Sequence, residues 1–144
     1  MNNNSLEVIK PNTFDRLSQL TQLILDNNHL EHVDEYLFKH LESLETLSLA
    51  ENKLKSIKNS LFKNQHKLIN LWLNNNEIET VEINSFLPLK NLSEINLENN
   101  NLSILDSKAF NGLVNLKTIL LDGNKFKKNP RIIISAYGSP IIKY

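Results

Sequence analysis

Residues 71–79 read LWLNNNEIE: two leucines flank a tryptophan, and three asparagines follow before the next apolar residue. Asparagine forms strands and helices poorly, and burying its amide is costly unless the amide is hydrogen-bonded. A single stretch of this kind would indicate no more than a turn. Its meaning depends on whether the same spacing occurs elsewhere in the chain.

The pattern recurs every 24 residues, in LILDNNHL from residue 23, LSLAENKL from 47, LWLNNNEI from 71, INLENNNL from 95 and ILLDGNKF from 119. One column of the repeat holds asparagine: Asn28, Asn52, Asn76, Asn100 and Asn124. A second holds leucine: Leu25, Leu49, Leu73, Leu97 and Leu121. A third holds phenylalanine: Phe14, Phe38, Phe62, Phe86 and Phe110. A fourth is aliphatic: Val33, Ile57, Val81 and Leu105. The unit is therefore LxxLxLxxNxLxx(V/I)xxxxFxxLxx.

This unit resembles the leucine-rich repeat, in the 24-residue form typical of extracellular proteins and receptor ectodomains. The resemblance covers nearly the whole chain, and Gln65 is its main departure, since other units have leucine at that position. It implies an α/β fold: a right-handed solenoid with a curved parallel sheet of about five short strands and an irregular or short helical convex side. Full repeats begin at residues 20, 44, 68, 92 and 116 and end at 130.

Elementary geometry supports this fold. In LxL the two leucines point to the same face, as in a short strand, and such a strand buries that face only when neighbouring turns stack on it. The resemblance implies that the asparagine column points inward and satisfies backbone groups of the turns, forming a ladder. Of the trio, only Asn76 has this role, and Asn74 and Asn75 are expected to face solvent. The phenylalanines are expected to pack as an aromatic spine.

The two ends depart from the repeat. Residues 1–19 are predicted to form a partial N-terminal repeat, in register from Asn4 but without a preceding LxxLxL. An unpaired edge is therefore expected at residues 22–26, with possible self-association through it. Residues 131–144 are predicted to be a C-terminal tail or partial cap, because Pro140 and Lys143 stand where strand leucines belong. These features leave a fragment of a longer protein as a serious alternative to a complete chain.

Composition narrows the classes of function. Sixteen basic and 16 acidic residues give zero formal net charge, so no global basic excess favours nucleic acid. No apolar run reaches the roughly 18 residues that indicate a membrane span. There is no cysteine, no P-loop and no nucleophile motif, and His29 and His32 lack a third metal ligand. We expect no enzyme activity, cofactor or metal.

The compartment is left open by the sequence. The resemblance favours an extracellular protein, whereas the lack of cysteine and of a signal peptide leaves a cytoplasmic one possible. Asn-Xaa-Ser sequons begin at Asn3, Asn91 and Asn101. They are no more frequent than the abundance of asparagine and serine predicts by chance, so they give no evidence of glycosylation.

The residues that alternate with the strand leucines, and the two before each ladder asparagine, are expected on the concave face. These 20 positions contain five acidic residues and neither lysine nor arginine. Trp72, the only tryptophan, lies among them. Large aromatic residues are enriched at binding hot spots, although Trp72 could instead lie flat on Ser48 and Asn96 without binding anything.

We therefore predict a protein-binding module that contacts a protein partner with a basic or apolar surface. The predicted contact residues are Trp72, Glu98, Glu94, Asp26, Asn74, Asp122, Ser48 and Asn96. The alternative is a structural or adhesion segment of a larger extracellular leucine-rich repeat protein, with no ligand of its own.

Overall fold

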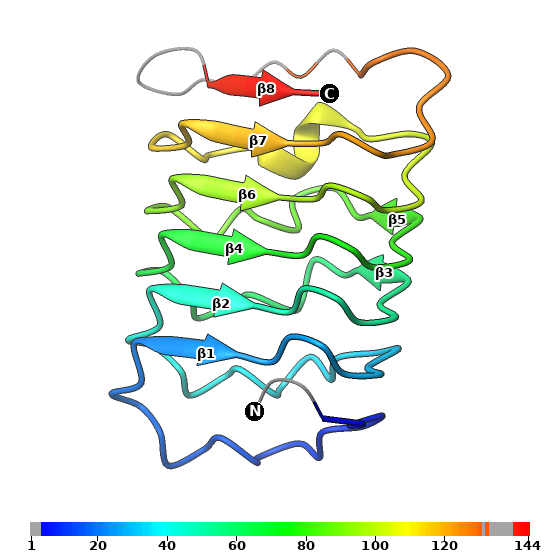
Figure 1. Cartoon of the computed structure of the whole chain (residues 1–144). Coiled ribbons are helices and arrows are strands. Elements are labelled where there is room, and N and C mark those ends of the chain that lie inside the picture. Colours follow the sequence, from blue (N-terminus) through cyan, green and yellow to red (C-terminus); the bar gives the residue numbers. More distant parts are fainter. Residues whose placement is uncertain (1–3, 131, 133–139) are drawn as a thin grey trace.

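The computed structural model describes residues 4–130, 132 and 140–144 (Figure 1). Within them, six short parallel strands form one sheet in the order β1-β2-β4-β6-β7-β8. These strands are β1 (Gln22–Ile24), β2 (Thr46–Ser48), β4 (Asn70–Trp72), β6 (Glu94–Asn96), β7 (Thr118–Leu120) and β8 (Ile141–Lys143). Each strand begins one turn of a solenoid, and the chain returns behind the sheet before the next (Figure 1). The predicted leucine-rich repeat solenoid is confirmed.

The strand register follows the sequence repeat from β1 to β7. Leu23 lies opposite Leu47, which lies opposite Leu71, so each step of the sheet is one 24-residue unit. The step from β7 to β8 is one residue shorter than the 24-residue repeat, because Ile142 of β8 lies opposite Ile119 of β7. The expectation that Lys143 occupies the leucine column is therefore wrong.

The slip of one residue at β8 has a physical reason. A one-residue shift exchanges the two faces of a strand, and in this register Ile142 packs against the core while Lys143 is exposed. The sheet thus gains a sixth strand within the predicted tail. Ile134 and Tyr137, which continue the phenylalanine and leucine columns in the sequence, lie outside the described residues.

The return side of the solenoid carries little regular structure. Two short strands, β3 (Ser56–Ile57) and β5 (Thr80–Val81), pair in parallel as a second sheet. This pairing uses the aliphatic column but was not anticipated. A 3-10 helix, η1 (Ser107–Phe110), is capped by Asp106, whose Oδ1 accepts a hydrogen bond of 2.8 Å from the Lys108 amide. The irregular or short helical convex side agrees with the prediction.

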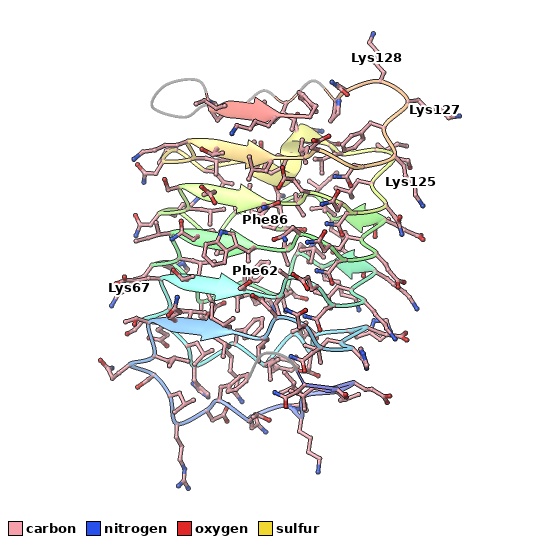
Figure 2. All side chains as sticks on the ribbon, in the orientation of Figure 1. Phe62, Lys67, Phe86, Lys125, Lys127 and Lys128 are labelled. Atoms are coloured by element: carbon pink, nitrogen blue, oxygen red, sulfur yellow. The ribbon has the colours of Figure 1, made fainter. Side chains whose placement is uncertain are left out.

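Phenylalanines fill the interior between the sheet and the return side. Phe38, Phe62, Phe86 and Phe110 are fully buried, with successive ring centroids 6.4, 6.1 and 5.7 Å apart. Figure 2 labels two of these rings. Gln65, the departure from the leucine column, is also buried. Its Nε2 donates to the Phe38 carbonyl at 2.6 Å, whereas its Oε1 has no hydrogen-bond partner among the described residues.

The ladder asparagines join successive turns. The Nδ2 of Asn76 donates to the carbonyl of Leu73 in its own turn at 3.1 Å and to that of Leu49 in the preceding turn at 2.9 Å. Its Oδ1 accepts from the Leu54 amide at 3.0 Å. The same three kinds of bond are made by Asn52, Asn100 and Asn124. Each amide therefore satisfies backbone groups that the turn leaves unpaired.

The residue before each ladder asparagine has a left-handed backbone. Asn27, Glu51 and Asn75 have φ of 55°, Asn99 has 53° and Gly123 has 70°. Asparagine and glycine tolerate this region better than other residues. Asn75 does face solvent as predicted, but its residue type also serves the turn.

Residues 4–19 lie directly beneath the first full turn (Figure 1). The Asn4 amide donates to the Asn27 carbonyl at 3.1 Å, and the His29 amide donates to the Leu6 carbonyl at 2.8 Å. Phe14 is buried at the base of the aromatic spine. The partial repeat thus covers the return side of the N-terminal end, whereas β1 remains the terminal strand of the sheet.

We expect Asn76→Ala to lower the free energy of unfolding by about 1–3 kcal/mol, because it leaves buried backbone groups unpaired. Asn74→Ala should be nearly neutral. Asn75→Ala should cost about 1 kcal/mol through its left-handed backbone, and Asn75→Gly should restore stability. Chemical denaturation of the four single variants checks this order. Equal damage from Asn74→Ala and Asn76→Ala would contradict the assigned register.

Phe86→Ala should cost roughly 3–5 kcal/mol, since it opens a cavity in the middle of the spine. Phe86 stacks between Phe62 and Phe110, so no other side chain can close the gap without moving. Thermal and chemical unfolding measure the loss. Phe86→Leu, which keeps most of the volume, should lose clearly less.

Candidate functional site

Strand alternation positions the concave face. In β4, β6 and β7 the central residue is buried, and the residues on either side of it are partly exposed on the sheet surface. Parallel pairing at a fixed register then places equivalent positions side by side across the sheet. Residues 24 apart in the chain are therefore neighbours on this face.

Trp72 occupies the middle of the concave face. It lies at the end of β4, opposite Ser48 of β2 on one side and Asn96 of β6 on the other. Its side chain is partly buried, and its Nε1 donates a hydrogen bond of 3.3 Å to Oε1 of Glu94. The indole is thus tied to a carboxylate on the next strand while part of the residue stays open to solvent.

Ser48 is not accessible on this face, although it was predicted as a contact residue. It is 0% exposed, because it lies in register between the larger residues Ile24 and Trp72. Its hydroxyl donates to Oδ1 of Asp26, which also accepts from the Ala50 amide at 3.0 Å. Ser48 therefore positions the Asp26 carboxylate from the neighbouring strand.

The remaining predicted residues lie on the same face. Asn96 and Glu98 hold each other: the Asn96 Nδ2 donates to Glu98 Oε2 at 3.1 Å, and the Glu98 amide donates to Asn96 Oδ1 at 2.9 Å. Asp122 is exposed and accepts the Gly123 amide at 2.9 Å. Asn74 is partly exposed two positions beyond β4.

Three acidic residues outside the concave face form ion pairs with lysine. Lys55 lies 2.9 Å from Glu31, Lys63 lies 3.7 Å from Glu35, and Lys39 lies 3.6 Å from Asp15. The hydrogen bond from Lys55 lowers the pKa of Glu31 and raises the pKa of Lys55.

Within the described part of the chain, no lysine or arginine forms an ion pair with a concave-face carboxylate. Asp26, Glu94, Glu98 and Asp122 are instead held by neutral donors. Labelled lysines such as Lys67 and Lys128 project outward from the edges of the solenoid (Figure 2). The concave face therefore keeps uncompensated negative charge around a tryptophan.

Sequence reasoning missed a cleft on the flank. It has a volume of about 730 Å³ and is formed by three successive turns that contribute, among others, Val8, His29, His32, Asp34 and Lys58. Val8 is 76% exposed at this place. His29 and His32, which the sequence analysis considered only as metal ligands, were the sequence feature that lies closest to this cleft. Over the described residues, no group of three or more His, Asp or Glu side chains is arranged to hold a metal ion.

Comparison with known families identifies the repeat. The family model of the BspA type leucine rich repeat region matches residues 2–129 with six copies. The chain belongs to this family of leucine-rich repeat proteins. No curated protein matches the chain significantly. Among the described residues, no helix is long and apolar enough to cross a membrane.

Solved structures share the solenoid. TLR13 in complex with ssRNA13 is 29% identical, with a TM-score of 0.85 over 90% of this chain and 18% of that one. Toll in its glycosylated complex with Spatzle, from Drosophila, is 25% identical, with a TM-score of 0.79 over 84% and 18%. The LRIM1/APL1C complex is 25% identical, with a TM-score of 0.78 over 85% and 22%. This chain thus spans about a fifth of the length of those proteins.

Proposed function

We propose that this chain is a protein-recognition module that binds its partner through the concave face. The observation that carries the proposal is the half-buried Trp72 among oriented carboxylates that lack cationic partners within the described structure. A tryptophan with part of its ring system exposed offers an apolar anchor with a low entropic cost of ordering.

The charges of the concave face define the complementary surface. Asp26, Glu94 and Glu98 are each oriented by a neutral donor, so little side-chain freedom is lost when a cation approaches them. A partner with lysine or arginine beside an apolar patch would supply the missing cations and cover the indole. Electrostatic complementarity of this kind favours fast and specific association.

Two comparisons bear on the class of partner. Toll is bound to Spatzle and TLR13 to ssRNA13 in the structures that this chain resembles. Binding a nucleic acid backbone requires lysine and arginine near the phosphates. The 20 concave-face positions of the five full repeats have neither, and Lys143 of β8, in register with Leu120, adds one lysine at the C-terminal end of the sheet. A protein partner is therefore the better fit for this face.

The alternative function is that of a structural segment in a longer solenoid, with an unoccupied concave face. The length comparison supports this alternative, because the chain spans only 18–22% of the length of the three solved relatives. The binding experiments below separate the two functions, since only a recognition module loses partners when its concave face is changed.

Trp72→Ala should weaken partner binding by about 2 kcal/mol or more, chiefly through faster dissociation. Affinity capture with wild-type and variant baits, followed by kinetics on a purified captured partner, measures the effect. Trp72→Phe is the matched control: it retains an aromatic ring but cannot donate to Glu94, so it should lose less than alanine. Unchanged capture by Trp72→Ala would count against the concave face.

Charge reversal at Glu94 and Glu98 should mainly slow association and reduce its salt dependence, because peripheral charges act on the encounter more than on residence. Lys63→Glu and Lys108→Glu, on the return side, serve as controls and should change little. Surface plasmon resonance across a salt series distinguishes the two sets. Loss of partners only in the lysine variants would place recognition on the return side.

We also expect the isolated chain to self-associate through the β1 end of the sheet, where strand pairing between molecules is possible. Sedimentation velocity over a concentration series tests this. A single monomeric species at high concentration would mean that the N-terminal partial repeat is an adequate cap.

A further inference from the structure

We propose that Asp122–Gly123 is a site of spontaneous backbone modification, at which aspartate isomerises through a cyclic succinimide. The proposal rests on one contact: the Gly123 amide nitrogen lies 2.9 Å from Oδ1 of its own neighbour Asp122. Oδ1 is bonded to Cγ, so the same contact holds the nitrogen beside the carbon that it would attack. Reactions of this intramolecular kind depend on close, aligned approach of the two groups.

The Gly123 amide differs from its equivalents in the other turns. The corresponding amides of Asn27, Glu51, Asn75 and Asn99 donate to backbone carbonyls of the next turn, at 2.8–3.1 Å. At Gly123 the amide is directed to the preceding side chain instead. In this turn the Gly123 nitrogen lies beside the carboxyl group of Asp122.

Asp26–Asn27 provides a comparison at the same repeat position. There the carboxylate is held by the Ser48 hydroxyl and the Ala50 amide, and the Asn27 amide donates to the Ala50 carbonyl at 3.1 Å. Both reacting groups are engaged by the next turn. Asn27 also carries a side chain, which hinders ring closure, whereas glycine does not. The following turn therefore protects the first site, whereas at the second the amide nitrogen contacts the side chain that it would attack.

The reaction balances without any co-reactant except water. The Gly123 nitrogen attacks Cγ of the protonated Asp122 side chain, a C–N bond forms, and the amide proton leaves with the displaced hydroxyl as water. Water then opens the ring. Attack at Cγ restores aspartate, and attack at the backbone carbonyl gives isoaspartate. Asp122 and Gly123 are both exposed, so water reaches the ring.

Isomerisation would alter the last described turns. Isoaspartate adds one methylene to the main chain two residues before Asn124, whose Nδ2 donates to Leu121 and Leu97 carbonyls at 2.8 and 2.9 Å. The same change displaces the Asp122 carboxylate on the concave face. Gly123 also packs closely, since a Cβ atom there would lie 2.1 Å from Oδ1 of Asn99.

Tryptic peptide mapping of aged protein tests the proposal. Cleavage after Lys117 and Lys125 isolates Asp122 on peptide 118–125, and cleavage after Arg16 and Lys39 isolates Asp26 on peptide 17–39. During incubation of the folded chain, peptide 118–125 should convert to an isomer of equal mass, through an intermediate lighter by one water. An isoaspartate-specific methyltransferase should label that isomer.

The folded and urea-unfolded chains give the deciding comparison. Peptide 118–125 should isomerise at least as fast in the folded chain as in the unfolded chain, whereas peptide 17–39 should be strongly slowed by folding. Equal protection of both peptides would overturn the proposal.

Asp122→Glu is the matched variant, because closing a six-membered ring is far slower. It should abolish labelling of peptide 118–125. The Asn111–Gly112 pair, which is prone to deamidation by sequence, falls on the separate peptide 109–117 and does not interfere. Labelling that persists in the Asp122→Glu variant would refute the site.

Discussion

The bridging of successive turns by one buried amide is the constraint on which this solenoid depends. Four ladder asparagines, those from Asn52 to Asn124, accept from a backbone amide of the preceding turn and donate to carbonyls of both turns, as Asn76 does with Leu54, Leu49 and Leu73. A backbone that leaves a strand inside a protein must find such partners, since unpaired buried groups are costly. Because these bonds hold the turn after each strand in place, they also set the distance between strands. That distance sets the register that stacks Phe62 on Phe86.

Much of the fold could be predicted because its core positions recur once per turn. The leucine, asparagine and phenylalanine columns have the same spacing in the sequence as in space, so the period alone gives the strand register. The parts that escaped prediction depend on contacts outside the pattern. Ile142 enters the core in place of Lys143 because β8 pairs 23 residues after β7. The pairing of β3 with β5 keeps the 24-residue register of the aliphatic column, since Ile57 lies opposite Val81, but the column does not show which return segments pair as strands.

The candidate site was predictable in outline but not in accessibility. The alternation of side chains along each strand shows which residues point away from the core, so Trp72 and the carboxylates lie on one face as expected. It does not show what a neighbouring turn covers. Ser48 has the right position, yet the residues in register on either side, Ile24 and Trp72, are large enough to bury it. The flank cleft escaped for a similar reason, because it arises from the fit of three turns and not from any motif.

The backbone also limits which residues of the concave face can be interpreted as recognition residues. The position before each ladder asparagine is exposed, but its left-handed conformation favours asparagine or glycine whatever the partner is, and four of the five repeats have one of these two while the second has Glu51. Asn75 and Gly123 are therefore explained by the turn. No such backbone restriction applies to the positions within the strands. It is also absent from the position two residues after each strand. Trp72, Glu94 and Glu98 all belong to these free positions, so neither the ladder nor the turn requires a tryptophan or a carboxylate there. The unpaired charge around Trp72 is thus a property that the fold permits without needing it, and this is what directs attention to binding.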